Sequence, residues 1–392
     1  MTALSQPGHA PVDGGLAAES LRSDSGQAMI EMKDIYKTYK NAAGEFPVLR
    51  GLYLTINRGE FVSIVGKSGS GNSTLLNMIT GIDHPTKGQV VIGGTDIYTG
   101  VTESQRSRWR GRNLGIVFQF FQLLPMLTLL ENVMLPMDYA EMYDFDERPE
   151  RAMELLKLVG LEKFAYKLPV LVSTGQQQTA AIARALACDP PVLVADEPTG
   201  NLDSRSAGAI IDLFDELARR GKTIVMVTHD PSLTARTTRN IVIFDGELID
   251  ETISRALPLL RHRHLLEMTK KAERIQVKPG EVILNCNAPV EQLYMVSKGS
   301  VDVMTQGGPD GRLIIRLGEG KLFGEIELRR GGPSLACVKA GESPVELLIY
   351  PRQAFLQILE QSPITAKALD KVIQQRLEEH QRIKNAMGSA KA

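Results

Sequence analysis

The sequence predicts an α/β domain built around a phosphate-binding loop, followed by a small β-roll or jelly roll with flanking helices. Three observations lead to this prediction. A glycine-rich stretch, residues 66–74, lies between a short apolar run and a helix-like run. From Met29 to about Thr252, short apolar strands alternate with longer helical stretches, as in α/β domains. Beyond residue 275, short strands are punctuated by glycines, which is typical of a small β-barrel or jelly roll.

Length and composition limit the possible functions. A chain of 392 residues has room for two domains. The net charge of −1 gives no field that would attract nucleic acid, so no nucleic-acid partner is expected. No segment approaches the ~20 apolar residues that cross a bilayer, and no signal-peptide pattern is visible. Cys188, Cys286 and Cys337 are widely spaced, so we expect each to be a small packing residue in a reducing cytoplasm.

The pattern divides the chain into four segments. These are a disordered lead-in over 1–28, an α/β domain over 29–253, a linker over 254–272 and a second domain over 273–385. In the linker, a basic stretch over 261–264 could touch anionic lipid, although a solvated linker is the simpler interpretation. The expected elements include strands over 114–117, 192–195, 223–227 and 241–244, a helix over 148–160 and a helical tail over 352–384.

The glycine-rich stretch has the strand, loop and helix order of a P-loop. Its glycines let consecutive backbone N–H groups surround a phosphate, and the following helix adds the positive end of its dipole. One position departs from the G-x-x-x-x-G-K-[ST] pattern, because an asparagine replaces the lysine. The loop reads Gly66-Lys67-Ser68-Gly69-Ser70-Gly71-Asn72-Ser73-Thr74.

Two carboxylates directly follow the apolar run 192–195. Beside a P-loop, Asp196 would bind Mg²⁺ through water while Ser73 supplies a hydroxyl ligand. Glu197 would orient and deprotonate the attacking water, and His229, after another strand, would contact the γ-phosphate. Taken alone, an acidic pair at a strand end is usually only solvated. The other motifs of the chain therefore decide its meaning.

Three further motifs accompany the loop and the acidic pair. They are Phe118-Gln119 after a strand, Ser173-Thr174-Gly175-Gln176 before a helix, and Gly200-Asn201-Leu202-Asp203. In this order the set resembles the nucleotide-binding subunit of ABC transporters over roughly residues 29–252. There the motifs are the Walker A, Q-loop, signature, Walker B, D-loop and H-loop. Residues 119–125, 131–133 and 196–203 are similar to the lipoprotein-release and macrolide-export branch.

The resemblance implies ATP and Mg²⁺ as ligands and a role for each matching position. Tyr39 would stack on adenine, with Tyr36 as a competing candidate. Gln119 would sense Mg²⁺ and couple to the membrane partner. Ser173 and Gly175 of the signature would contact the γ-phosphate of ATP held by the opposite subunit.

The same resemblance implies partners. Because each site is shared, the catalytic unit would be a head-to-tail dimer, either a homodimer or a heterodimer with a second ATPase subunit. The signature also includes Gln176, and Asp203 belongs to the D-loop. The membrane partner in this branch is a permease of the FtsX-like type, which places the subunit in the cytoplasm, peripherally on the inner face of the cell membrane.

Two departures from the family pattern affect catalysis. Asn72 cannot act as a cation toward the β- and γ-phosphates, and losing a charge-assisted hydrogen bond would weaken binding or rate about 10- to 150-fold. Thr174 is stiff and bulky where the family has glycine. Thr179 replaces a residue that is usually basic. The sequence therefore allows a slowed ATPase or an ATP-binding regulatory subunit with little turnover.

The second domain resembles a cyclic-nucleotide-binding domain in residues 278–281, 293–301 and 322–326. The resemblance implies that Gly324 opens a phosphate-binding cassette, that Glu325 accepts the ribose 2′-OH and that backbone N–H groups hold the cyclic phosphate. The arginine that pairs with the phosphate is replaced by Ser334, which cannot supply that charge. Ligand-free structural or dimerising use and cyclic-nucleotide sensing both remain possible.

A cyclic-nucleotide-dependent transcription factor is the competing class. Such proteins place a helix-turn-helix after the barrel, and only about forty residues with one helical stretch follow it here. The sequence thus favours the energy-coupling subunit of an ABC transporter. A non-hydrolysing regulatory subunit, or one that responds to a cyclic nucleotide, is the alternative. The transported substrate and the direction of transport leave no trace in the sequence.

Overall fold

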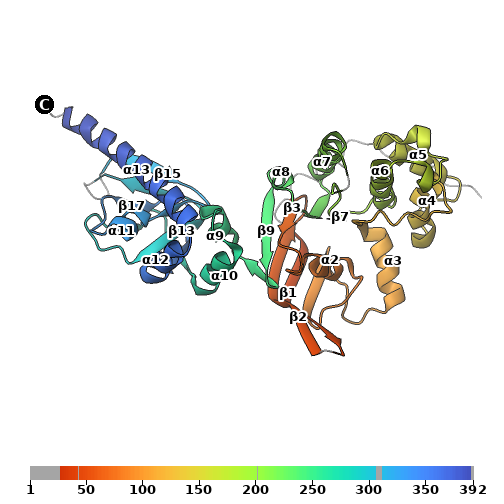
Figure 1. Ribbon diagram of the computed structural model, residues 1–392, viewed down its shortest axis with the longest axis horizontal. Helices are drawn as coiled ribbons and strands as arrows, with labels where there is room; N and C mark the ends of the chain where they lie inside the picture. Colours follow the sequence, from red (N-terminus) through yellow and green to blue (C-terminus); the bar gives the residue numbers. More distant parts are fainter. Residues whose placement is uncertain (1–26, 43, 201, 306–310, 390–392) are drawn as a thin grey trace, which may run out of the picture. The chain divides into compact units, whose positions relative to one another are not determined.

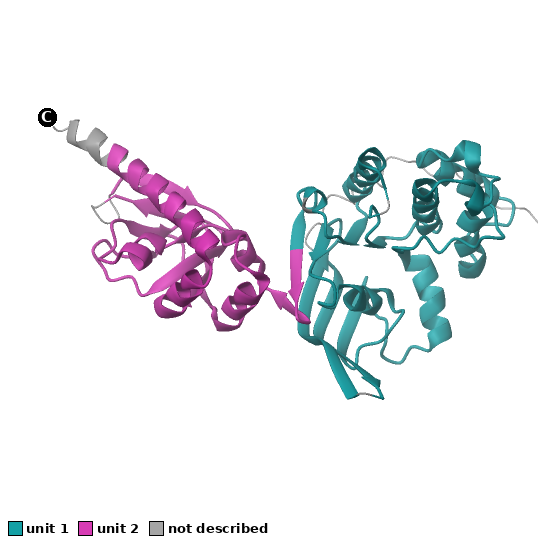
Figure 2. Cartoon of the chain, in the orientation of Figure 1, with its two compact units in different colours: residues 1–240 teal, residues 241–392 magenta. Residues whose placement is uncertain are grey.

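The computed structural model describes residues 27–42, 44–200, 202–305 and 311–389. The predicted lead-in lies outside this range except for its last two residues, and Ala28 already begins a strand. The chain forms two compact units, residues 1–240 and 241–392 (Figure 2). This division lies closer to the N-terminus than the boundary predicted near residue 253.

Two sheets organise the first unit (Figure 1), and the larger one also includes strand residues between 241 and 249, at the start of the second unit. The four-stranded antiparallel sheet has the order β2-β1-β4-β5 and consists of β1 (Ala28–Asn41), β2 (Gly44–Asn57), β4 (Lys87–Ile92) and β5 (Thr95–Asp96). The six-stranded sheet has the order β10-β9-β3-β8-β7-β6. Its strands are β3 (Phe61–Val65), β6 (Leu114–Val117), β7 (Val192–Asp196), β8 (Thr223–Val227), β9 (Arg239–Phe244) and β10 (Glu247–Ile249).

The strands β3, β8, β7 and β6 are parallel neighbours at the centre of this sheet. Their sequences are nearly continuous apolar runs, and β8 is buried along its whole length. That composition is expected for parallel strands that are covered on both faces. The strands predicted over 114–117 and 223–227 are confirmed with the same bounds.

Helices account for most of the rest of the first unit. They are α2 (Asn72–Thr80), α3 (Glu103–Asn113), α4 (Leu129–Ala140), α5 (Arg148–Leu158), α6 (Thr174–Ala185), α7 (Ser204–Arg219) and α8 (Pro231–Thr234), with short 3₁₀ turns over Glu162–Phe164 and Pro169–Leu171. The helix predicted over 148–160 corresponds to α5. In the core, the ring of Phe61 meets the edge of Phe214 on α7, with centroids 6.1 Å apart.

The second unit is a β-roll made of two antiparallel four-stranded sheets, which confirms the predicted fold class. Their strand orders are β11-β18-β13-β16 and β12-β17-β14-β15. The strands are β11 (Glu273–Val277), β12 (Val282–Leu284), β13 (Gln292–Lys298), β14 (Val301–Met304), β15 (Leu313–Leu317), β16 (Leu322–Phe323), β17 (Cys337–Ala340) and β18 (Val345–Pro351).

Five helices flank the roll: α9 (Glu251–Ala256), α10 (His262–Lys271), α11 (Glu325–Arg330), α12 (Arg352–Glu360) and α13 (Pro363–Ser389). The stretch predicted as a linker therefore contains α10 and the end of α9. Leu265 and Met268 of α10 pack into the core of the second unit, and His264 is only 1% exposed. An apolar helix face explains why this stretch folds. No described helix is long and apolar enough to cross a membrane.

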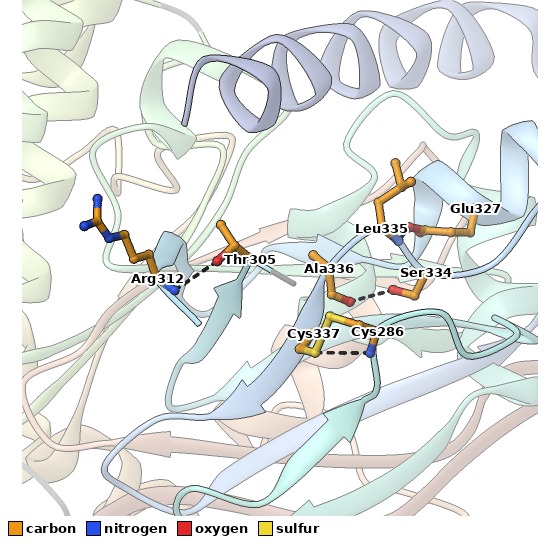
Figure 3. Close-up of a disulfide and its surroundings, with 8 residues drawn as sticks. All are labelled: Cys286, Thr305, Arg312, Glu327, Ser334, Leu335, Ala336 and Cys337. Atoms are coloured by element: carbon orange, nitrogen blue, oxygen red, sulfur yellow. Dashed lines mark hydrogen bonds between the residues drawn. A yellow bond between two sulfur atoms is a disulfide. The ribbon is translucent and has the colours of Figure 1, made fainter. Parts of the chain in front are cut away.

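The cysteines differ from the expectation. Cys286 and Cys337 form a disulfide whose Cα atoms are 4.6 Å apart (Figure 3), so the prediction that each is a separate packing residue is wrong for these two. Antiparallel pairing of β12 with β17 brings together residues 51 positions apart. Cys188 alone is free and buried, as expected of a small packing residue.

Candidate functional site

The parallel strands of the first unit deliver the predicted site residues to one edge. The glycine-rich loop follows β3, Gln119 lies two residues after β6, Asp196 ends β7, and His229 lies two residues after β8. In open α/β sheets, ligands bind outside the carboxyl ends of the strands. The fold thus brings residues from four separate stretches to one place.

These residues line a cavity of about 400 Å³. Its walls combine loop backbone, hydroxyl groups, carboxylates and one imidazole. The lining residues are Val48, Ser68, Gly69, Gly71, Asn72, Ser73, Thr74, Gln119, Asp196, Glu197, Val227 and His229. Gly66, Lys67 and Ser70, also predicted as phosphate contacts, are not among them. Val48 and Val227 are additions; Val227 directly precedes the Thr228-His229 motif, whereas nothing in the sequence marks Val48.

The loop leads directly into α2. Gly71 precedes the helix with φ of 107°, a left-handed conformation that glycine adopts without strain. No described side chain caps the N-terminus of α2. The first N–H groups of a helix lack partners within it, so those of α2 are available to a phosphate. The backbone half of a phosphate site is therefore in place.

Asn72 has a structural role inside this loop. Its side-chain Nδ2 donates to the carbonyl oxygen of Gly66 at 2.9 Å, and its Oδ1 accepts from the Ser70 hydroxyl at 3.4 Å. The residue is 8% exposed. Asn72 thus links the start of the loop to its end. None of the described residues that line the cavity is a lysine or arginine.

The two carboxylates have different partners. Ser73 Oγ donates to Asp196 Oδ2 at 3.2 Å, and burial raises the pKa of Asp196 above its usual value, although the Ser73 hydroxyl and His229 oppose the shift. Glu197 Oε1 lies 3.0 Å from His229 Nε2. Glu197 has a φ of 46°, which is uncommon for a side chain of this size. Such conformations persist where the surroundings hold them and are frequent at functional sites.

The donor set suits Mg²⁺ held together with a nucleotide. Mg²⁺ prefers oxygen ligands and usually binds through one or two protein groups plus substrate phosphates. Ser73 and Asp196 provide one hydroxyl and one carboxylate within hydrogen-bonding distance of each other. Among the described residues there is no cluster of three or more His, Cys, Asp or Glu that could hold a metal ion. Gln119 lines the same cavity and remains a predicted third contact.

Tyr39 lies beside the loop helix. Its hydroxyl donates to Asp83 Oδ2 at 2.8 Å and also interacts with the Thr74 side chain. Burial and the hydrogen bond to Asp83 raise the pKa of Tyr39. The Tyr36 side chain instead lies beside Gly51 and Lys87. This placement favours Tyr39 over Tyr36 as the adenine contact, although Tyr39 does not line the cavity.

The signature and D-loop residues cap helices in the single chain. Ser173 precedes α6, its hydroxyl accepts from the Gln176 N–H at 3.3 Å, and Gln176 Oε1 accepts from the Ser173 N–H at 2.9 Å. Gly175 follows in the first turn. Asp203 Oδ1 accepts from the N–H groups of Arg205 and Ser206 before α7. Neither motif lines the cavity of its own chain, and Asn201 lies outside the described residues.

The predicted cassette of the second unit surrounds a cavity of about 70 Å³. Gly324, Glu325 and Ser334 all line it. Glu325 is fully buried, and its Oε1 accepts from Arg376 Nη1 of α13 at 2.5 Å. Burial raises the pKa of Glu325, although Arg376 opposes the shift. The Ser334 hydroxyl donates to the Ala336 carbonyl at 2.7 Å (Figure 3).

Comparison with known proteins supports both predicted resemblances. Residues 49–200 match the family model described as ABC transporter, and residues 274–362 match that of the cyclic nucleotide-binding domain. The chain is 43% identical to the lipoprotein-releasing system ATP-binding protein LolD of Anaeromyxobacter dehalogenans, over 56% of this chain and 92% of that protein.

Two further comparisons cover the same part of the chain. The macrolide export ATP-binding/permease protein MacB of Syntrophobacter fumaroxidans is 43% identical over 57% of this chain, which spans only 32% of that protein. The dimeric ATP-binding cassette MJ0796 bound to ADP and Pi matches with a TM-score of 0.54 and 43% identity, over 56% of this chain and 96% of the other. The chain therefore belongs to the family of ABC transporter ATP-binding proteins, and it carries a cyclic-nucleotide-binding-like domain C-terminal to its ATP-binding domain.

Proposed function

We propose that the chain is the ATP-binding subunit that energises an ABC transporter through a separate membrane permease of the FtsX-like type. The observation that carries this proposal is the gathering of Ser73, Asp196, Glu197 and His229 around an uncapped glycine loop. The subunit would act in the cytoplasm, peripherally on the inner face of the cell membrane. The likeness to LolD and MacB supports a membrane partner.

ATP would bind with its phosphates on the loop and at the N-terminus of α2. Mg²⁺ would be held by Ser73 and Asp196, with Gln119 near it, and it would offset phosphate charge. Tyr39 would contact adenine. Because no lysine or arginine lines the described part of the cavity, the protein's contacts with the phosphates would come mainly from backbone N–H groups, with His229 at the γ-phosphate.

Hydrolysis would depend on the pair of Glu197 and His229. Glu197 would orient a water molecule and accept its proton, which is general-base catalysis. His229 Nε2, 3.0 Å from the carboxylate, would hold Glu197 in position and face the γ-phosphate. Without the P-loop lysine, the transition state loses one cation, so a slow rate is expected.

The active unit would be a head-to-tail dimer. Ser173, Gly175, Gln176 and Asp203 lie outside the cavity of their own chain, which is the arrangement expected if they complete the site of an opposite subunit. In a homodimer, both sites would combine Asn72 with Thr174. A partner ATPase with an intact loop and signature would leave only one of the two defects in each site, so we propose that strong hydrolysis requires such a partner.

The second candidate is a regulatory subunit that binds ATP without hydrolysing it. The observation that favours it is the use of Asn72 as a loop crosslink rather than as a phosphate contact. Phosphate release by the purified chain, by Glu197→Gln and by Asn72→Lys separates the two. A rate that Glu197→Gln abolishes supports the ATPase. Tight ATP binding with no Glu197-dependent rate, in the Asn72→Lys background as well, supports the regulator. Ordinary turnover by the purified chain alone would refute the need for a partner.

A further inference from the structure

The cassette of the second domain contains a carboxylate at the place where an anionic ligand would bind. Leu335, directly after Ser334, donates its backbone N–H to Glu327 Oε1 at 3.0 Å (Figure 3). Glu327 lies on α11 and is only 6% exposed. A backbone N–H that already donates to a carboxylate of its own chain is not free for a phosphate oxygen.

The carboxylate expected to accept a sugar hydroxyl also has a partner. Glu325 Oε1 accepts from Arg376, and Arg376 Nη1 also donates to the Leu322 carbonyl at 2.8 Å. Because Arg376 lies on α13, this contact joins the cassette to the C-terminal helix. A second ion pair, between Arg329 of α11 and Asp370 of α13 at 3.0 Å, also joins these two helices.

Charge around the cavity opposes an anionic ligand. Three carboxylates line its described part, those of Glu325, Glu327 and Glu379, and Arg376 is the one lysine or arginine among its described lining residues. That arginine is engaged by Glu325. Glu379 is exposed and His380 also lines the cavity, but Glu325 and Glu327 are buried. Like charges repel strongly at low dielectric, so a cyclic phosphate would meet repulsion from these two buried carboxylates as well as an occupied N–H group.

The available space leads to the same conclusion. A volume of about 70 Å³ is enough for a few water molecules, each of which needs roughly 10–15 Å³ by this measure. Glu325 Oε2 has no hydrogen-bond partner among the described residues, and it borders this small space. The cavity can hydrate that oxygen, but with the Glu327 side chain in place it is too small for a base, a ribose and a phosphate.

We propose that Glu327 takes the place of the anionic ligand in this cassette, so that the second domain keeps α11 and α13 joined without a cyclic nucleotide. In this arrangement the domain is a ligand-independent structural unit. Two positions prevent cyclic-nucleotide binding. Glu327 occupies the anion site, and Ser334 stands where the family has the arginine that pairs with the phosphate. The inference rests on the second domain alone and does not depend on the proposed ATP chemistry.

Calorimetric titration of the full chain with cyclic AMP and cyclic GMP tests the proposal. The wild type should show no binding at ligand concentrations up to about 1 mM, a weak-affinity limit. The double variant Glu327→Ala/Ser334→Arg should bind at least about 10-fold more tightly than that limit, at about 0.1 mM or below, because it frees the N–H group and adds a charge-assisted contact. The matched control, Ser334→Arg alone, should gain nothing, since Glu327 would still occupy the N–H group and pair with the new arginine.

Hydrogen exchange at the Leu335 amide tests the same contact without a ligand. Exchange should accelerate about 10- to 150-fold in Glu327→Ala, the effect of losing a hydrogen bond to a charged group. It should accelerate less in Glu327→Gln, whose carbonyl can still accept. Wild-type binding of a cyclic nucleotide at micromolar concentration, equal affinities of the single and double variants, or unchanged Leu335 exchange in Glu327→Ala would each overturn the proposal.

Discussion

The glycine loop of the first domain and the cassette of the second are both regions in which the sequence predicts that backbone N–H groups bind an anion, and each lacks a cation of its family pattern. Asn72 stands in place of a lysine in one, and Ser334 in place of an arginine in the other. Their surroundings differ. The loop lines a cavity of about 400 Å³ and leads into a helix whose N-terminus has no side-chain cap. The cassette lines a cavity of only about 70 Å³, and the backbone N–H of Leu335 in it donates to Glu327.

The difference indicates that a site without its cation can keep a large cavity and free backbone N–H groups, or it can lack both. In the first domain, Mg²⁺ can bring positive charge in with the nucleotide, because Ser73 and Asp196 are arranged to hold it. In the second, a carboxylate of the chain itself accepts from the Leu335 N–H group, and the arginine that lines the described part of the cavity, Arg376, is engaged by Glu325. We therefore expect the first site to bind its anion conditionally and the second to exclude one.

Replacing Glu197 should have the largest effect on the first site. Glu197→Gln keeps the size of the side chain and its contact with His229 but removes the proton acceptor, so phosphate release should fall about 10²- to 10⁴-fold. Binding of a fluorescent ATP analogue should change little, which is the control. If the wild-type rate is too low to measure, the comparison is made in an Asn72→Lys background. Equal rates there would show that Glu197 is not the base.

Withdrawing Mg²⁺ should separate this site from one with a lysine. Two carboxylates and no lysine or arginine line its described part, so ATP in EDTA should bind at least about 100-fold more weakly than Mg·ATP, given charge interactions of several kcal/mol at such distances. Calorimetry in the two buffers measures the ratio. Asn72→Lys should narrow the gap, and similar affinities for the wild type in both buffers would contradict the interpretation.

Restoring the cation should help the first site directly. Asn72→Lys should raise kcat/KM for ATP about 10- to 150-fold, the value of a charge-assisted contact. Asn72→Ala is the matched control, because it removes the hydrogen bond to Gly66 without adding charge. If both variants lose activity, the loop needs the Asn72 crosslink more than it lacks a lysine.

Sequence reasoning predicted the first domain well because its signals are local. A glycine loop between an apolar run and a helix, and carboxylates at strand ends, each define their own place in a parallel sheet. The pairing of Glu197 with His229 then follows from the neighbouring strands β7 and β8. Ser73 instead reaches Asp196 from α2, because β8 lies between β3 and β7. The sequence did not predict Val48 as a lining residue, because an apolar residue in an edge strand has no feature that distinguishes a ligand contact from a packing contact.

The second domain was predicted less completely because its deciding contacts join distant positions. The pair of Glu325 and Arg376 spans 51 residues, and that of Glu327 and Leu335 depends on how the loop after α11 folds back. Pairing of β12 with β17 likewise brought Cys286 to Cys337. The absent arginine at Ser334 was visible in the sequence, but the carboxylate that replaces the ligand was not.

The smallest effect should appear in the pH dependence of the unfolding midpoint of the second domain. Burial raises the folded-state pKa of Glu325 above its usual 4.5, although Arg376 opposes the shift, so the folded state holds a proton more tightly than the unfolded state. Stability from this group is therefore highest at low pH and falls as pH rises through the raised pKa. Relative to Glu325→Gln, which cannot ionise, the wild-type unfolding midpoint should decrease as the pH rises above the usual pKa of about 4.5.

A shift of about 2–4 °C in that difference corresponds to ~1 kcal/mol in a domain of this size, within reach of scanning calorimetry. The neighbouring groups that could also contribute are Glu327, Arg376, Glu379 and His380, which line the same cavity. Repeating the scans in Glu327→Gln separates the second carboxylate from the first. A midpoint difference that stays constant with pH would mean that Glu325 remains ionised in the folded state. Arg376 would then balance the charge of Glu325, whereas no lysine or arginine lines the described part of the first site.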